Sequence, residues 1–179
     1  MAARTTLTHM ATAGCIGASG DFIMQRYEKG SEMTLDSMRT ARIMAYRIPQ
    51  APLLHVCWSR FDHWAIVLKL SGGRAVIFKV ACDQLICNPF FTTAFYMSQS
   101  LMEDLAVDEA VDRTRRGMLP TWWRGFQYYG CVHCITFAII PVAYRIAWNS
   151  CAAVAWTAYL SHANQTLMQQ EQQHASKVD

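Results

Sequence analysis

The chain contains 179 residues, of which 53% are hydrophobic and 16% are charged, and its formal net charge is +3. Soluble proteins carry about 25% charged residues, so this composition excludes a disordered tail, a coiled coil and a strongly basic nucleic-acid binder. Seven cysteines are too few for a disulfide scaffold of this length. The length indicates one domain, residues 1–179.

Five long stretches of the chain contain no Asp, Glu, Lys or Arg. They are residues 5–20, 48–59, 84–102, 125–144 and 146–170. A helix needs about 20 residues to cross a bilayer core, so the last three are long enough and the first two require one ionisable residue each. We predict an all-α, polytopic membrane bundle of about four transmembrane helices plus short interfacial helices. A soluble helical domain is the alternative, although its helices would normally show a charged outer stripe.

The first predicted span, residues 6–25, carries small residues four positions apart. These pairs are Ala13 with Gly17 and Gly14 with Ala18. Such pairs let helix backbones approach closely, so we expect this helix to pack against its neighbours. Residues 1–20 lack acidic residues and contain Arg4, a weak resemblance to a mitochondrial presequence that a first span explains equally well.

Three further spans are predicted between charged connectors. They cover residues 43–61, 80–102 and 122–144. The longest connector, residues 103–124, is interpreted as a short surface helix because its acids precede its bases, the order that complements a helix dipole. Three prolines within the uncharged stretches are expected to kink their helices: Pro52, Pro89 and Pro141.

The C-terminal uncharged region is too long for one span. Residues 125–161 would measure roughly 55 Å as one helix. With the fourth span at residues 122–144, residues 145–161 become a further helix along or partly within the interface, and a fifth span is the alternative. The glutamine-rich tail, residues 162–179, is expected to fray in water.

Aromatic residues gather at the ends of two predicted spans. Trp58 and Trp64 lie at the exit of the second span, and the fourth begins with Trp122, Trp123, Tyr128 and Tyr129. This placement is typical of interfacial aromatic belts. Trp148 and Trp156 lie within the last uncharged stretch, where ordinary core packing is the competing interpretation.

Ionisable and amide side chains within or beside the spans are the candidate functional residues. Such groups are costly in hydrocarbon, so they pair, reach the interface or line a water-filled path. Lys79 and Asp83 are four residues apart, as are Asp21 and Gln25, so each pair is expected to share a helix face. Internal pairing and pore lining both remain open for this set: Asp21, Gln25, Lys79, Asp83, Gln84 and Arg145, with Arg47 as a further ionisable group.

The motif Cys131-Val-His-Cys134 has the spacing of a redox pair or half a zinc site. A structural zinc site needs four ligands, and thiolates are costly in an apolar stretch, so packing cysteines are favoured. The polar residues His55, Asp62 and His63 are interpreted as a helix-end cluster. The sequence contains no hydrolase elbow, phosphate loop or dinucleotide fingerprint. We therefore expect no enzymatic activity, no cofactor and no metal.

Six short motifs occur in order along the chain. They are Gly20-Asp21-x-x-x-Gln25, Asp36-x-x-Arg39-Thr40-x-Arg42, Pro52-x-x-His55-x-x-Trp58, Lys79-x-x-x-Asp83-Gln84, Pro141-x-x-Tyr144-Arg145 and Trp156-x-x-Tyr159-Leu160-Ser161. In this order and spacing the chain resembles the Mpv-seventeen and twenty-two-kilodalton peroxisomal membrane protein family. The resemblance implies a four-span helical protein of the inner mitochondrial or peroxisomal membrane, some of whose relatives form channels.

The leading hypothesis is therefore an integral organellar membrane protein that forms a channel or pore for small solutes and contributes to mitochondrial homeostasis. Its expected location is the mitochondrial inner membrane, with the peroxisomal membrane as the alternative. Its expected partners are the lipid bilayer, small solutes and further copies of itself, but no nucleic acid. Two alternatives remain: a non-conducting scaffold protein of the inner membrane, and a membrane thiol oxidoreductase that uses Cys131 and Cys134.

Overall fold

The computed structural model describes residues 2–29, 34–138, 140 and 145–178. Within these residues the fold is all-helical, which confirms the predicted class. The elements are α1 (Ala2–Lys29), α2 (Ser37–Val67), α3 (Gly72–Cys82), the π-helix η1 (Asp83–Cys87), α4 (Asn88–Met102), α5 (Val107–Ala138) and α6 (Arg145–Val178).

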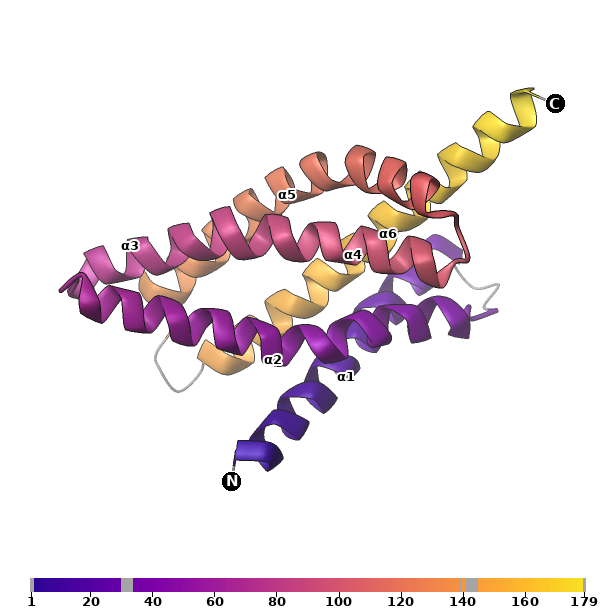
Figure 1. Cartoon of the computed structure of the whole chain (residues 1–179). Coiled ribbons are helices and arrows are strands. Elements are labelled where there is room, and N and C mark those ends of the chain that lie inside the picture. Colours follow the sequence, from indigo (N-terminus) through magenta and orange to yellow (C-terminus); the bar gives the residue numbers. More distant parts are fainter. Residues whose placement is uncertain (1, 30–33, 139, 141–144, 179) are drawn as a thin grey trace.

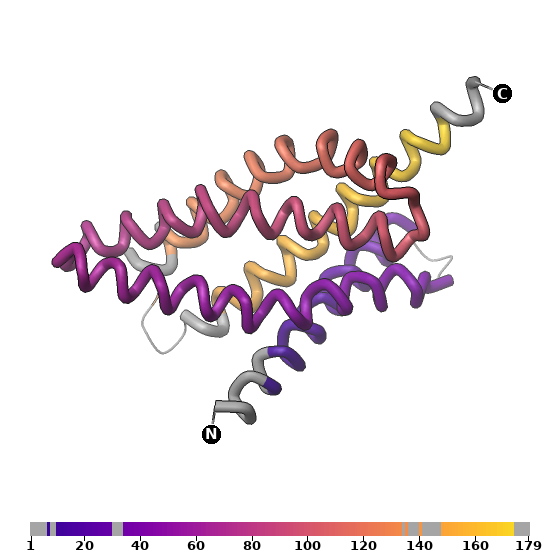
Figure 2. Tube along the Cα trace, viewed as in Figure 1, coloured from indigo at the N-terminus to yellow at the C-terminus, as the bar shows by residue number. Residues whose placement is uncertain are grey.

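Two long helical rods, α2 and the rod formed by α3, η1 and α4, lie side by side and run in opposite directions at the centre of the fold. Figure 1 shows α3, η1 and α4 as one continuous rod that returns alongside α2. Helix α5 packs against α4 on the other side, and α6 packs against both α5 and α1. The Cα trace in Figure 2 shows α1 crossing α2 at an angle instead of joining the central pair in parallel.

The turns between the rods are short. The backbone reverses after α2 through Lys69 and Gly72, which have φ values of 53° and 55°, and the amide of Leu70 donates to the carbonyl of Ala65 at 2.9 Å. Most of the residues between the predicted spans 43–61 and 80–102 therefore belong to α2 and α3. The turn after α4 contains Asp104 at φ 60°, a conformation that Asp tolerates better than most residues.

The predicted surface helix in residues 103–124 and the predicted span 122–144 form one helix, α5. Its first turn carries Asp108 and Glu109, which complement the dipole, and the helix continues through Pro120 to Ala138. The last part of the predicted span, residues 139 and 141–144, lies outside the described residues.

Helix α6 joins the predicted interfacial segment 145–161 to the tail that was expected to fray. The helix is continuous to Val178. Part of the reason is that Glu171 on this tail bonds to Arg113 and Arg116 on α5. The polar tail is therefore helical as far as Val178.

The other predicted spans lie inside longer helices. Residues 6–25 fall within α1, residues 43–61 within α2, and residues 80–102 cross α3, η1 and α4. None of the helices, over the residues that are described, reaches both the length and the mean apolarity of a typical membrane span. Helix α2 is unbroken at Pro52, Pro89 is the second residue of α4, and Pro141 lies outside the described residues.

Glycines bring α1 against its neighbours, as the small-residue pairs predict. A Cβ added at Gly17 would lie 3.0 Å from Cγ of Arg47 on α2. One added at Gly20 would lie 2.7 Å from the carbonyl oxygen of Val154 on α6. Only a residue without a side chain allows these approaches.

The burial pattern differs from that of an ordinary soluble domain. The fully buried set is rich in polar side chains, and many large apolar side chains lie on the outside. The buried polar residues include Asp21, Gln25, Gln84, Gln99, Ser100 and Ser161. The exposed apolar residues include Leu53, Val56, Ile77, Leu85, Phe90 and Trp123.

Apolar packing concentrates in two aromatic clusters. One contains Tyr46, Phe95, Tyr96, Trp156 and Leu160, so Trp156 is a core residue and not part of an interfacial belt. The other contains Phe61, Cys87 and Phe91. The two clusters flank the start of α4, where the polar residues of η1 also lie.

Candidate functional site

The π-helix η1 results from an irregular hydrogen-bond register near Pro89. The amide of Asn88 donates to the carbonyl of Asp83, five residues back. In the same register the next donor would be Pro89, which has no amide hydrogen. The carbonyl of Gln84 instead accepts from Nε1 of Trp122 on α5 at 3.0 Å. Single-turn π-helices are frequent at functional sites.

Polar side chains extend from this irregular turn into the bundle. Oδ1 of Asp83 accepts from Nε1 of Trp58 at 2.8 Å, and Oδ2 accepts from Nε2 of Gln84 at 2.9 Å. Nδ2 of Asn88 donates to Oε1 of Gln84 at 3.0 Å. Nε2 of His133 lies 3.9 Å from Oδ2 of Asp83. The carboxylate of Asp83 is therefore oriented by neutral donors and faces an imidazole.

A cavity of about 160 Å³ lies beside these residues, between α2, η1, α4, α5 and α6. Its polar lining residues are Arg47, Gln50, Asp83, Gln84, Asn88, Thr92, His133 and Asn149. Aromatic side chains also line the wall: Tyr46, Trp58, Phe91, Tyr129 and Trp156. Mixed polar and aromatic walls are typical of small-molecule sites.

Arg47 brings a positive charge to this cavity. Its stem packs on Gly17 of α1, and Nη1 donates to Oε1 of Gln50 at 2.8 Å. Nε of Arg47 is buried and makes no hydrogen bond. The guanidinium has five N–H donors, so this hydrogen-bond pattern leaves it capacity for another acceptor.

The predicted pairing of Lys79 with Asp83 is wrong. Lys79, in the last turn of α3, forms an ion pair with Asp62 on α2. The physical reason is that α3 runs back alongside α2, so the carboxylate of Asp62, which is 59% exposed, lies within reach of the long, flexible lysine. Asp83 instead lies at the interior face of η1.

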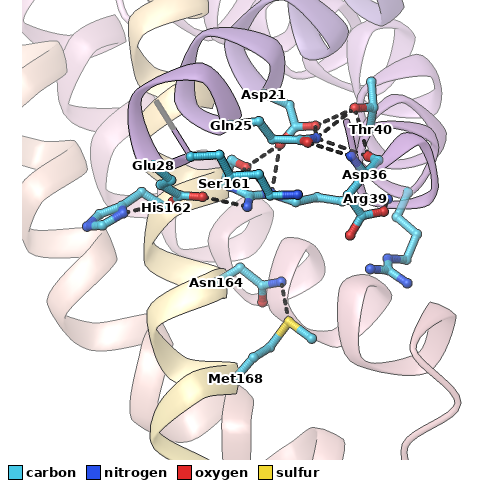
Figure 3. Close-up of polar contacts among 12 residues, drawn as sticks. Asp21, Gln25, Glu28, Asp36, Arg39, Thr40, Ser161, His162, Asn164 and Met168 are labelled. Atoms are coloured by element: carbon cyan, nitrogen blue, oxygen red, sulfur yellow. Dashed lines mark hydrogen bonds and ion pairs between the residues drawn. The ribbon is translucent and has the colours of Figure 1, made fainter. Parts of the chain in front are cut away.

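Asp21 and Gln25 pair as expected, but in a second polar cluster away from the cavity. Nε2 of Gln25 donates to Oδ2 of Asp21 at 2.8 Å, and both residues are 0% exposed. Nε of Arg39 lies 2.9 Å from Oδ1 of Asp21 and also donates to Oγ of Ser161. Thr40 donates to Asp21 as well. Figure 3 shows these side chains converging from α1, α2 and α6.

We call the cluster of Asp21, Gln25, Arg39, Thr40 and Ser161 the α1–α2–α6 lock. Glu28 and His162 form its edge, which is more exposed to solvent. Glu28 accepts from Nη1 of Arg39 at 2.7 Å and lies 3.1 Å from Nδ1 of His162. Partial burial pushes the pKa of Glu28 upward, but the hydrogen bonds from Arg39 and His162 outweigh it and hold the pKa below its ordinary value.

A third ionic group joins Arg113 to Glu103 and Glu171, and these partners outweigh desolvation and raise the pKa of Arg113.

The structure therefore divides the sequence-predicted residues. Asp83 and Gln84 line the cavity, Asp21 and Gln25 belong to the lock, and Lys79 pairs with Asp62 at the surface of α2 and α3. The side chain of Arg145 lies outside the described residues. Arg47, named from the sequence as a further ionisable group, also lines the cavity. The predicted set did not include the other polar lining residues, for which the only signal was a polar residue interrupting an uncharged stretch: Gln50, Asn88, Thr92, His133 and Asn149.

Only one cysteine of the predicted redox motif can be placed. Cys131 is exposed on α5, and the side chain of Cys134 lies outside the described residues. Cys57 and Cys82 pack beside Cys87 in the second aromatic cluster. The described part of the chain holds no group of His, Cys, Asp or Glu side chains arranged to bind a metal ion.

Comparisons with known proteins agree with the resemblance. A model of the Mpv17 / PMP22 family matches residues 100–161. Protein SYM1 of Gibberella zeae is 30% identical over 169 residues, which cover 92% of this chain and 93% of that protein. The chain belongs to the Mpv17 / PMP22 family. The mitochondrial inner membrane protein Mpv17 of Caenorhabditis elegans is 25% identical, over 88% of this chain and 85% of that protein. No solved structure matches the chain.

Family membership establishes the general class of the protein. It is an organellar membrane protein, and its relatives support the predicted location in the mitochondrial inner membrane. The peroxisomal part of the Mpv17 / PMP22 family fits the alternative location. Several motifs behind the resemblance converge in space: Asp21, Gln25, Arg39, Thr40 and Ser161 come from three motifs and form one lock.

Proposed function

We propose that this Mpv17 / PMP22 family protein is a polytopic bundle that forms a channel or pore for small solutes in the mitochondrial inner membrane and contributes to mitochondrial homeostasis. The observation that carries the proposal is the cavity of about 160 Å³ with a polar lining, located where the π-helix interrupts the central rod. The proposed partners are the bilayer, small solutes and further copies of the chain, and no catalytic step is involved.

The distribution of side chains supports the membrane part of the proposal. Gln84 and Gln99 are 2% exposed, whereas the neighbouring apolar residues Leu85 and Phe90 are each 59% exposed. In water this pattern would leave large apolar surfaces solvated. In a bilayer the same pattern places apolar side chains against lipid and polar groups inside the bundle.

We favour a fifth span for residues 145–161. Trp156 and Leu160 of α6 belong to the main aromatic cluster, and Ser161 is 1% exposed within the lock. Helix α6 therefore contributes to the interior of the bundle on more than one side. A helix lying along the interface would bury only one apolar face.

The proposal is tested by single-channel recording from the purified full-length protein in planar bilayers. We expect conductance steps. Ala153→Phe adds a bulky side chain to the cavity wall and should lower conductance at least several-fold, whereas Ala155→Phe, on the exposed face of the same helix, should leave it unchanged.

Bilayers that stay silent over a range of voltages and redox conditions would overturn the channel proposal. If Ala153→Phe fails to fold, the smaller Ala153→Val provides a graded test at the same position. Equal conductance in wild type and both cavity variants would show that the solutes do not pass through this cavity.

A non-conducting scaffold is the second candidate function, and the α1–α2–α6 lock favours it. The lock joins three helices with buried charges that do not line the cavity. A scaffold should tolerate Ala153→Phe in cells that lack the native protein, because its helices and outer surface remain unchanged. Failure of that variant to complement, while it is stably inserted, would argue for the channel.

A further inference from the structure

The cavity wall contains two residues of opposite charge that do not pair with each other. Arg47 on α2 donates to Gln50, one turn further along the same helix. Asp83 on η1 accepts from Trp58, which lies further along α2. Tyr129, also in the wall, lies within electrostatic reach of both charges.

Neither charge is neutralised by the other. Asp83 receives hydrogen bonds from Trp58 and Gln84, which are neutral donors. Arg47 donates to the neutral amide of Gln50 and has one buried donor without a partner. Charges in a poorly solvated site are stabilised chiefly by ions of opposite sign. A solute with a single charge would neutralise only one of these two groups and leave the other without a counter-ion.

We propose that the cavity selects small zwitterions of the amino acid class, with the carboxylate toward Arg47 and the ammonium group toward Asp83. This inference rests on the proposed channel function and specifies its solute. The aromatic wall of Tyr46, Tyr129 and Trp156 packs against the carbon chain of the solute and attracts its cationic end. A cavity of about 160 Å³ limits the solute to a few heavy atoms.

Four matched solutes test the charge preference. γ-Aminobutyrate is a zwitterion, γ-hydroxybutyrate is an anion, γ-aminobutyramide is a cation and γ-hydroxybutyramide is neutral, and all four have nearly the same size. Uptake into liposomes that contain the full-length protein is measured for each. We expect the zwitterion to enter about tenfold faster than the anion or the cation, each of which lacks one charge-assisted contact, and about a hundredfold faster than the neutral solute, which lacks both.

Two variants test which residue recognises the carboxylate of the solute and which recognises its ammonium group. Arg47→Gln should abolish the preference for carboxylate over amide and keep the preference for ammonium over hydroxyl. Asp83→Asn should do the reverse. Lys79→Gln and Asp62→Asn remove charges of the solvent-exposed ion pair between α2 and α3 and should change neither ratio. Arg47→Lys keeps the positive charge and tests the same position if Arg47→Gln folds poorly.

The outcomes separate this inference from the channel proposal. Uptake no faster than in protein-free liposomes for all four solutes would overturn the channel itself. Protein-dependent uptake of all four at equal rates, or faster uptake of the anion or cation, would overturn the zwitterion preference and leave the channel standing. A preference that persists unchanged in both Arg47→Gln and Asp83→Asn would also overturn it.

Discussion

The lock and the cavity use the same kinds of residue in opposite ways. In the lock, Asp21 and Arg39 are in direct contact, and Gln25, Thr40 and Ser161 fill their remaining hydrogen-bonding positions. In the cavity, Asp83 and Arg47 form no ion pair with each other, and each is met mainly by neutral groups. The closed arrangement joins helices, whereas the open one leaves charge available to a ligand.

Local backbone geometry explains this difference. The lock forms where Gly20 lets α1 and α6 approach to contact, so side chains from three helices reach one point. The cavity forms where the π-helix alters the spacing of side chains along the central rod. Close packing therefore favours paired charges, and a helix irregularity leaves room between them.

Breaking the lock should have the largest effect on stability. Asp21→Asn leaves Arg39 buried without its main countercharge, and we expect the free energy of unfolding to fall by about 3–5 kcal/mol. The measurement is denaturant unfolding in detergent. Asp62→Asn, in the exposed pair with Lys79, is the control and should lower it by about 0–1 kcal/mol. Equal effects of the two variants would contradict this account of the lock.

Adding a side chain at Gly20, where α1 and α6 approach closely beside the lock, should have the next largest effect on stability. A Cβ at Gly20 would meet Val154 and Thr157 at 2.7 and 2.8 Å, and the first of these contacts is with backbone that cannot easily move. We expect Gly20→Ala to destabilise the protein by about 1–3 kcal/mol in the same unfolding assay. Gly73→Ala has open space around it, and a comparable loss there would show that helix approach is not the cause.

The third effect concerns the cavity and the π-helix. Trp122→Phe removes the donor to the carbonyl of Gln84, so we expect a loss of about 1–3 kcal/mol from an unsatisfied buried acceptor. Pro89→Ala supplies a backbone amide near this carbonyl and should recover part of the loss in the double variant. The measurement is a double-mutant cycle: the unfolding free energies of wild type, Trp122→Phe, Pro89→Ala and the double variant. Strictly additive losses would contradict the proposed link between Pro89 and Trp122.

The helical class and most helix positions could be predicted because uncharged stretches and small-residue pairs are local features of the sequence. Gly14 and Gly17 indicated the packing of α1, and the spacing of Asp21 and Gln25 indicated their bond. The lengths of α5 and α6 could not be predicted. They depend on contacts between distant residues, such as Arg113 with Glu171, which stabilise segments that look like connectors.

The candidate site could be predicted only in part, for a similar reason. Asp83 and Gln84 stand out in the sequence, but a spacing of four residues suggested that Lys79 was the partner of Asp83. The tight turn between α2 and α3 places the two helices side by side, so Lys79 forms its ion pair with Asp62. Contributions from Arg47 and His133 require knowledge of how α2 and α5 surround the central rod.

The smallest expected effect is a pH dependence at the edge of the lock. Because the folded-state pKa of Glu28 lies below its ordinary value of 4.5, ionised Glu28 stabilises the fold above that pH, and this contribution is lost as the pH falls through the folded-state pKa. Glu28→Gln should therefore be less stable than wild type at neutral pH, and the gap should close progressively below pH 4.5. Unfolding free energies of both proteins across this range make the measurement. Because both proteins keep Asp21 and Arg39, the closing gap isolates the edge of the lock from its buried centre, and a gap that stays constant into acid would show that Glu28 acts there by packing and not by charge.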